Sequence, residues 1–181
     1  LRKDYKLRSL LGRGHFGETW LATKVNTRRT DRSEEYVAIK LLHIPDEPIT
    51  PPNMDLLPPV IKNMYLETET AYLKEMKEKN AIFSKEVATH AKLHHNNIVP
   101  FLDGDIYHGQ PFIVMELAFM GNLLTYRRQK EMQTGQALTI EEVVNFVLQS
   151  AEGLEYAHSK NVFHRDVKPE NLLITKKDYK M

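Results

Sequence analysis

The chain has 181 residues, 41% of them hydrophobic and 27% charged, which is ordinary for a globular protein and suits one compact domain or a small lobe with part of another. A net charge of +1 argues against a nucleic-acid binder held by bulk charge, so we expect no nucleic-acid partner. With no cysteine, neither a disulfide framework nor a thiolate metal site is available. No signal peptide or apolar run of bilayer length is visible, and we therefore expect a cytoplasmic or nuclear protein without a membrane span.

The first 42 residues carry strand signals. Leu7–Leu11 leads into a glycine turn, Thr19–Thr23 leads out of it, and residues 35–42 are rich in β-formers. Residues 43–60 then hold six of the nine prolines, a composition that cannot sustain a helix or a central strand. This segment is therefore predicted to be an extended, exposed loop.

Helix signals and two further strands follow. Residues 61–93 are charged and predicted to be helical, whereas 98–107 and 111–117 are predicted to be strands around a turn. The clearest helix begins at Thr139, where Thr139 and Glu142 match a capping box. Its apolar residues recur at helical spacing, so we expect one wide apolar face. Strands with one helix, followed by helices, predict an α+β lobe joined to a mostly helical one.

Three glycines in a G-x-G-x-x-G array, Gly12, Gly14 and Gly17, let a backbone approach a phosphate closely. A dinucleotide-binding fold would need a helix directly after the third glycine, where this sequence indicates a strand. A Walker A loop would need lysine where Glu18 stands. The pattern therefore favours a β-hairpin flap, with an ordinary glycine-rich hairpin as the alternative.

A lysine and a glutamate stand out in the middle of the chain. Strand alternation puts Lys40 on the same face as Ala38. Glu86 lies within a predicted apolar helical stripe, where an unpaired carboxylate is unfavourable, so Lys40 is its natural partner. The stripe comprises Ile82, Phe83, Val87, His90 and Ala91. Two alternatives remain open, in which Lys40 lies at the sheet edge or Glu86 at the stripe's edge, each with its charge in water.

The segment NVFHRDVKPENLLIT places three chemically useful groups within six residues. Asp166 could accept a proton from a hydroxyl nucleophile or orient it. Lys168 could neutralise a transferring phosphoryl group, and Asn171 offers a neutral oxygen of the kind that Mg²⁺ accepts. A polar turn held by its own hydrogen bonds explains any one of these residues, but not all of them at this spacing.

With these motifs in order from Leu11 to Ile174, the chain resembles a eukaryotic protein kinase. The resemblance implies ATP and Mg²⁺ as cofactors, with Asp166, Lys168, Lys40 and Glu86 as catalytic residues and Asn171 as the metal ligand. Met115 would be the gatekeeper beside the adenine. The implied ATP-binding residues are Leu11, Gly12, Gly14, Phe16, Gly17, Thr19, Ala38, Lys40, Met115, Glu116, Ala118 and Leu173.

The resemblance also implies a bilobal fold, with an antiparallel N-lobe at 1–115, a hinge at 116–121 and part of a helical C-lobe at 122–181. Lys168 followed by Pro169-Glu170-Asn171 resembles the serine/threonine branch, so the expected partner is a protein substrate bearing Ser or Thr. The alternatives are a pseudokinase that keeps the nucleotide pocket, and an interaction module without phosphotransfer.

Three departures from the family pattern matter. Thr19 stands where valine is usual, which predicts somewhat weaker nucleotide binding, and His90 replaces an apolar residue, which predicts a helix that is more easily displaced. Residues 43–80 are an insertion with a minimal proline-directed phosphorylation site, Thr50-Pro51, and P-x-x-P spacings that suggest a regulatory partner. A tolerated surface loop is the simpler interpretation.

The last departure is at the C-terminus. The segment KKDYKM is expected to be the hairpin before a D-F-G triplet, which this sequence does not contain. We therefore expect a chain truncated before its metal-binding aspartate and activation segment, with little phosphotransferase activity of its own. The apolar face of the helix at 139–158 would then be largely uncovered.

Overall fold

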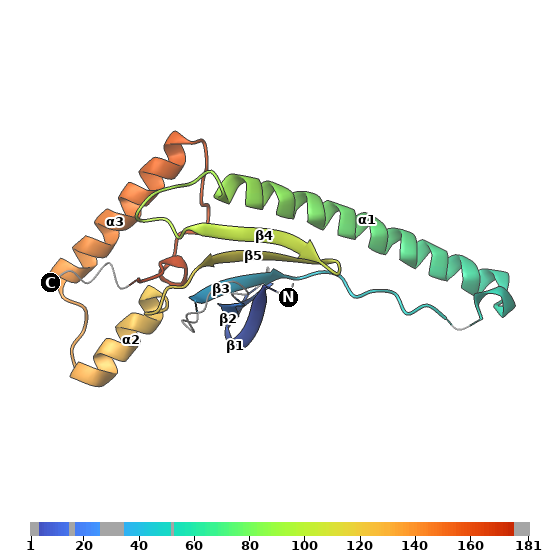
Figure 1. The fold of residues 1–181 in the computed structure, drawn as a ribbon, viewed down its shortest axis with the longest axis horizontal. Helices are drawn as coiled ribbons and strands as arrows, with labels where there is room; N and C mark the ends of the chain where they lie inside the picture. The colour runs from blue at the N-terminus through green and yellow to red at the C-terminus, as the bar shows by residue number, and fades with distance from the viewer. Residues whose placement is uncertain (1–3, 15–16, 26–34, 52, 176–181) are drawn as a thin grey trace.

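The computed structural model describes residues 4–14, 17–25, 35–51 and 53–175. Figure 1 shows a twisted sheet, a long helix along it and two shorter helices beyond one end of the sheet. The strands are β1 (Tyr5–Gly14), β2 (Gly17–Lys24), β3 (Glu35–Leu42), β4 (Phe101–Tyr107) and β5 (Gln110–Glu116). The helices are α1 (Pro59–His90), α2 (Leu123–Thr134) and α3 (Ile140–Ser159), with short 3-10 turns η1 (Met54–Leu56) and η2 (Pro169–Asn171). This arrangement confirms the predicted α+β fold.

The sheet is antiparallel with strand order β1-β2-β3-β5-β4. Its two edge strands approach each other where the Tyr5 hydroxyl of β1 donates a hydrogen bond to Asp103 Oδ2 of β4 at 3.3 Å. This curl encloses an apolar core on one face of the sheet, because strand side chains alternate between faces. The core residues are Tyr5, Ala22, Val37, Ile39, Phe112 and Val114. Val37 and Ile39 therefore lie on the core face, as the alternation in β3 predicts, and Lys40 lies on the other.

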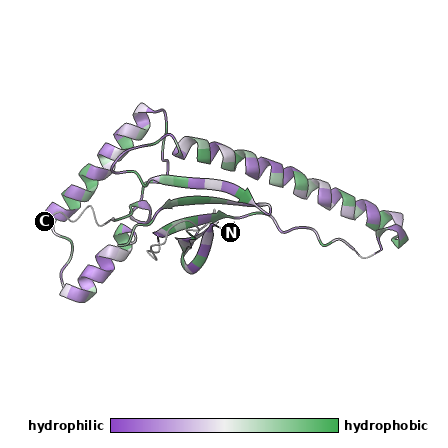
Figure 2. Ribbon diagram, in the orientation of Figure 1, coloured by the Kyte–Doolittle hydropathy of each residue, from purple (hydrophilic) through white to green (hydrophobic). Residues whose placement is uncertain are grey.

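Helix α1 has 32 residues and is about 48 Å long, so it extends well past the sheet (Figure 1). Hydrophilic and hydrophobic residues alternate along its length (Figure 2). A half-buried stripe follows the helical repeat through Tyr65, Tyr72 and Met76 to the buried Phe83. Ile82, which was expected in the apolar stripe, is 65% exposed, so that assignment was wrong. The stripe is narrower than the sequence suggests, because only the side directly over the sheet is covered.

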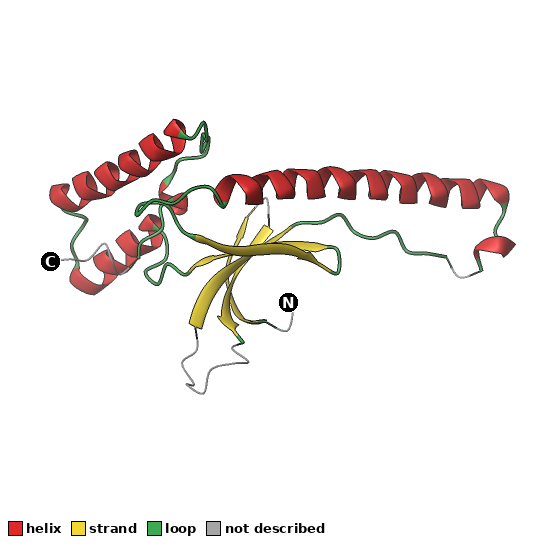
Figure 3. Ribbon diagram, turned by 45° about the horizontal axis from the view of Figure 1, so that its top comes forward, coloured by secondary structure: helices red, strands yellow, loops and turns green. Residues whose placement is uncertain are grey.

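The proline-rich segment runs outward from β3 beneath α1, and α1 then returns toward the sheet (Figure 3). We call residues 43–51 and 53–58 the strap, since they join β3 to α1. Most of the strap has no regular secondary structure, which confirms the extended loop, although η1 interrupts it and α1 begins at Pro59. Proline suits the first turn of a helix because the N–H it lacks would be unpaired there.

Helix α2 was not predicted from the sequence. Its N-terminus is capped by Asn122, whose side chain accepts a hydrogen bond from the Thr125 amide, and it ends at Gly135 with φ of 67°. Both capping signals are visible in the sequence, but α2 has no strong apolar periodicity between them. Helix α3 begins after Thr139 with the predicted capping box.

The apolar face expected on α3 is largely exposed, at Ile140, Val143, Val144, Val147 and Leu148. Within the described residues, no helix combines the length and apolarity that crossing a bilayer requires.

The loop after α1 attaches the sheet region to α3. Asn97 Nδ2 donates to Glu152 at 2.8 Å, and the His95 ring stacks on Tyr156 with centroids 5.1 Å apart. At Gly153 a Cβ atom would lie 2.8 Å from the Asn97 carbonyl oxygen, so only glycine allows this approach.

Candidate functional site

The glycine array forms the tip of the β1–β2 hairpin, where Gly14 pairs with Gly17. The antiparallel pairing of β1 with β2 confirms the hairpin prediction, and the strand that begins at Gly17 excludes the helix that a dinucleotide-binding fold requires. Gly17 has φ of 152°, and a Cβ there would lie 1.9 Å from the Leu41 carbonyl oxygen. In contrast, a Cβ at Gly12 would meet nothing within 4 Å. The fold itself therefore requires glycine at Gly17 but not at Gly12. Phe16 lies outside the described residues.

Several expected nucleotide-binding residues share one face of the sheet. Thr19 pairs with Lys40 across β2 and β3, and Ala38 pairs with Met115 across β3 and β5. Paired residues, and those two apart on a strand, point to the same side. Leu11 is exposed and lies at an irregularity in the β1 register. This face is the one opposite the apolar core.

The predicted Lys40–Glu86 partnership is present. The Nζ of Lys40 lies 3.0 Å from Oε1 of Glu86, which joins β3 to α1 across 46 residues of sequence. The side chains are 28% and 41% exposed, so water reaches the pair and its Coulomb attraction is partly screened. The pair therefore holds the Lys40 ammonium and the Glu86 carboxylate on the sheet face opposite the apolar core, and we expect it to contribute little to the stability of that core.

His90 is held at the end of α1. Its Nε2 lies 2.8 Å from the carbonyl oxygen of Val99, and its ring lies 5.8 Å from that of Phe101. These contacts tie the end of the helix to the segment leading into β4. The expectation that His90 makes the helix more easily displaced stays a prediction. In this structure the His90 ring contacts Val99 and Phe101 and so attaches the end of α1 to the loop after it.

The loop after α3 gathers the three expected catalytic groups. Lys168 Nζ lies 2.8 Å from Oδ2 of Asp166, and Asn171 Nδ2 donates to that same oxygen at 2.9 Å and to the Asp166 carbonyl at 2.8 Å. The hydrogen bonds from Lys168 and Asn171 lower the pKa of the Asp166 carboxyl, and the bond to Asp166 raises the pKa of Lys168. Arg165 turns the chain here with φ of 61°. Asp166 is consequently an ionised, preoriented acceptor.

The segment expected to be the hinge connects the sheet to the helices. The amide of Glu116 donates to the carbonyl of Pro100, and the carbonyl of Ala118 accepts from the amide of Gly121. Asn122 forms a bridge with Leu173, which brings the segment after the catalytic loop beside the hinge. The hinge segment and Leu173 therefore lie side by side although about 50 residues separate them in the sequence.

Part of a binding site for a divalent cation is present in the loop that follows α3. Because Asn171 uses its Nδ2 to bond Asp166, its Oδ1 is the atom left to offer a cation. The described residues contain no group of three His, Cys, Asp or Glu side chains arranged to hold a metal. The donor set thus fits a cation that takes most of its ligands from phosphate and water.

The match to known families agrees with this geometry. A model described as protein kinase domain matches residues 60–181, about two thirds of the chain. The chain belongs to the protein kinase family. The match covers Glu86 of α1 and the loop from Asp166 to Asn171, while the glycine hairpin and Lys40 precede it.

Relatives that cover nearly the whole chain include one named as a tyrosine-protein kinase and one named as a serine/threonine-protein kinase. The chain is 29% identical to the human proto-oncogene tyrosine-protein kinase ROS over 98% of its length, which is 6% of that protein. It is also 29% identical to an Aurora kinase of Dictyostelium discoideum over 94% of its length, which is 35% of that protein. A serine/threonine/tyrosine-protein kinase HT1 of Arabidopsis thaliana is 39% identical over 51% of this chain and 23% of its own. The kinase domain described here thus spans less than half of each of these relatives.

Sequence reasoning missed the residues that hold the two parts of the kinase domain together. Asn97, Glu152, Gly153 and Tyr156 each belong to an unremarkable local pattern. A glycine inside the otherwise helical repeat of α3 was the available signal, because such a glycine often marks a close approach of another backbone.

Proposed function

We propose that this kinase domain supports transfer of the γ-phosphate of ATP to a serine or threonine hydroxyl of a protein substrate. The observation that carries the proposal is the Asp166–Lys168–Asn171 cluster, in which a carboxylate with a lowered pKa is held in place by two neighbouring donors. The ion pair between Lys40 of β3 and Glu86 of α1 supplies the second half of the site.

In the proposed reaction, the substrate hydroxyl oxygen forms a bond to the γ-phosphorus, and the bond to the β–γ bridging oxygen breaks to release ADP. Asp166 accepts the hydrogen bond of the attacking hydroxyl and takes its proton. Because Lys168 lowers the pKa of Asp166, the carboxylate is a weak base, so it mainly orients the hydroxyl and receives the proton late.

The remaining roles follow from position. Lys40, held by Glu86, neutralises the α- and β-phosphates, and Gly12 and Gly14 let the hairpin backbone approach the phosphates. Main-chain groups of Glu116 and Ala118 that the hinge bonds do not use would meet the adenine edge.

Asn171 Oδ1 would hold Mg²⁺, which neutralises charge on the phosphates when bound.

The lobes and the partners are also part of this proposal. The domain boundaries would be an N-lobe at 1–115, a hinge at 116–121 and the start of a C-lobe at 122–181. The resemblance of Lys168-Pro169-Glu170-Asn171 to serine/threonine kinases supports a substrate hydroxyl of Ser or Thr, and the strap is the place we assign to regulation.

Asp166→Asn tests the proposal in the complete protein that carries this domain. The variant should transfer phosphate about 10²–10⁴ times more slowly while binding ATP as the wild type does. Asp46→Asn, which alters an exposed carboxylate of the strap, should leave both unchanged. A wild-type protein that binds a fluorescent ATP analogue but labels no acceptor would support the pseudokinase alternative. Peptides that differ only in a Ser, Thr or Tyr acceptor would decide the substrate class, and faster labelling of the Tyr peptide would refute the assignment.

A further inference from the structure

The strap carries a hydroxyl presented in the form that a modifying enzyme needs. Thr50 is exposed, has no regular secondary structure, and lies between Ile49, which is 90% exposed, and Pro51. It is the one serine or threonine in the sequence that is followed by proline. An extended backbone of this kind can enter the cleft of another protein without unfolding a helix or strand, once the hydrogen bond between Thr50 and Tyr65 opens.

Three prolines of the strap are partly covered by the rest of the protein. Pro45, Pro48 and Pro51 recur every third residue and are each half-buried. The pairs between them, Asp46-Glu47 and Ile49-Thr50, are exposed. Recognition of a P-x-x-P segment requires several of its prolines to dock in an aromatic groove, whereas a proline-directed kinase needs access to one hydroxyl and the single proline after it. The exposure pattern therefore favours modification of Thr50 over docking of the prolines.

We propose that Thr50 is a phosphorylation site for a separate, proline-directed protein kinase. The Thr50 Oγ1 forms a bond to the γ-phosphorus of ATP, the bond to the β–γ bridging oxygen breaks, the hydroxyl proton passes to the base of the modifying kinase, and ADP leaves. Pro51 supplies the selectivity. It has no N–H, so a substrate groove without an acceptor at that position accepts proline and leaves the N–H of any other residue unsatisfied.

The surroundings of Thr50 define what the phosphate does. Its Oγ1 lies 3.0 Å from the Tyr65 hydroxyl of α1, and Lys62, one helical turn before Tyr65, lies 3.6 Å from the fully exposed Asp55. A phosphate with about two negative charges accepts a bond from the Tyr65 hydroxyl and attracts Lys62 more strongly than Asp55 does. Glu69, one turn beyond Tyr65, opposes this weakly because its flexible side chain can turn away.

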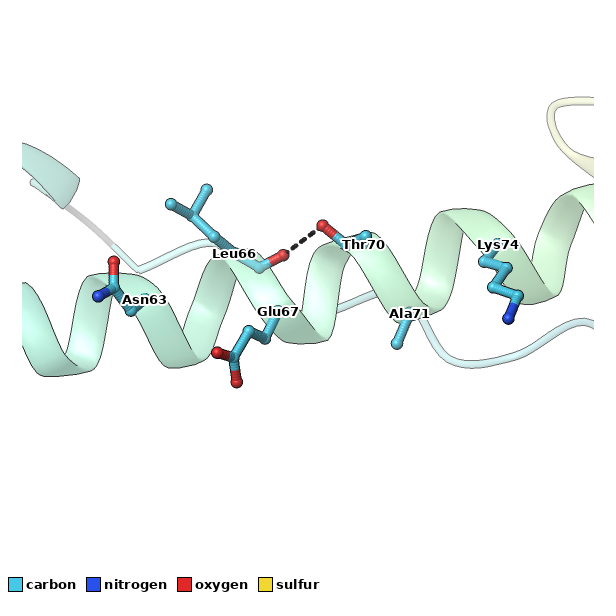
Figure 4. Close-up of a pocket in the computed structure, with 6 residues that line it drawn as sticks. All are labelled: Asn63, Leu66, Glu67, Thr70, Ala71 and Lys74. Atoms are coloured by element: carbon cyan, nitrogen blue, oxygen red, sulfur yellow. Dashed lines mark hydrogen bonds between the residues drawn. The ribbon is translucent and has the colours of Figure 1, made fainter.

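Phosphorylation should therefore fasten the strap to α1. The strap joins β3, which carries Lys40, to α1, which carries Glu86, so this attachment acts on the segment between the two partners of the ion pair. The opposite face of α1 is different. It is lined by Asn63, Leu66, Glu67, Thr70, Ala71 and Lys74, all from α1 itself (Figure 4). Thr70 on that face bonds its own helix at the Leu66 carbonyl, which makes it a matched control.

The modification is tested by incubating the chain with ATP and a proline-directed kinase of the cyclin-dependent class, and locating phosphate by peptide mass spectrometry. We expect phosphate on Thr50, none in Thr50→Ala, a rate lower by about tenfold or more in Pro51→Ala, and no change in Thr70→Ala. An unmodified Thr50, or equal rates for the wild type and Pro51→Ala, would overturn the proposal. Phosphate on Thr50 without the added kinase would overturn the assignment to a separate enzyme.

The consequence is tested by hydrogen exchange of the strap amides before and after phosphorylation. Exchange across residues 43–51 should slow several-fold, and Lys62→Gln should remove most of that slowing. Lys74→Gln, a matched change on the opposite face, should leave it intact. Unchanged or faster exchange in the phosphorylated wild type would overturn the anchoring role.

Discussion

At the scale of single residues, the three glycines of the hairpin differ in why they are glycine. Gly17 combines φ of 152° with a space that the Leu41 carbonyl already occupies, so its requirement comes from the fold. Gly12 has open space where a side chain would be, so its requirement, if the proposed function is correct, comes from a ligand. The glycine motif thus contains one position required by the fold and one that we assign to ligand binding.

Replacing each glycine by alanine should separate them. Gly17→Ala should lower the free energy of unfolding by about 1–3 kcal/mol, because the backbone must shift away from Leu41. Gly12→Ala should leave stability nearly unchanged and weaken binding of a fluorescent ATP analogue several-fold. Denaturant unfolding and ligand titration measure the two effects. Wild-type nucleotide affinity in Gly12→Ala would count against the flap.

At the scale of elements, α3 depends on an interaction that also reaches α2. Thr139 Oγ1 accepts from the Glu142 amide at 3.2 Å, and Glu142 Oε2 accepts from the Thr139 amide at 2.8 Å. Lys130 of α2 donates to the same carboxylate. That bond, followed by the one from the Thr139 backbone, lowers the pKa of Glu142.

The stabilisation by Glu142 should depend on pH. Its pKa in the folded state lies below the ordinary value of 4.5, so its contribution is complete above that value and disappears as the pH falls through the folded-state pKa. Glu142→Gln should lower the free energy of unfolding by about 0.5–1 kcal/mol near neutral pH and by progressively less in acid. Glu141→Gln, the neighbouring exposed acid, serves as the control. Equal effects of the two variants at neutral pH would refute the capping role.

At the scale of the whole molecule, two connections join the sheet region to the helices. The hinge and its bridge to Leu173 are one, and the packing of the loop after α1 on α3 is the other. The second connection links the helix that carries Glu86 to the helix that leads into the catalytic loop. The two halves of the candidate site are therefore positioned both by the hinge and by the contact at Gly153.

Gly153→Ala should test this connection. Alanine in place of glycine inside a helix normally stabilises by about 1 kcal/mol. Here the added methyl group would press on the Asn97 carbonyl, and we expect a net loss of about 1 kcal/mol measured by thermal or denaturant unfolding. Glu155→Ala, at an exposed position of the same helix, should change stability little. A variant at Gly153 that is more stable than the wild type would show that the loop does not pack tightly there.

The elements that were predicted correctly depend on neighbours in sequence. The alternation in β3, the capping box at Thr139 and the cluster from Asp166 to Asn171 each involve residues within a few positions, so their pattern carries the structure. Helix α2 was missed because its surface is mostly polar and it lacks a strong apolar repeat. Ile82 was misplaced because the sequence does not say how wide a strip of α1 the sheet covers.

By itself, the sequence determined the order of the local elements of this kinase domain: a glycine hairpin, the strand with Lys40, the helix with Glu86 and the loop from Asp166 to Asn171. Only the tertiary structure decided how exposed the Lys40–Glu86 pair is, that Gly17 is required by β3, and that the loop carrying Asn97 packs against Gly153. The reason is that periodicity and capping act over a few residues, whereas burial and close backbone approach depend on segments that lie tens of residues apart and meet only when the chain is folded.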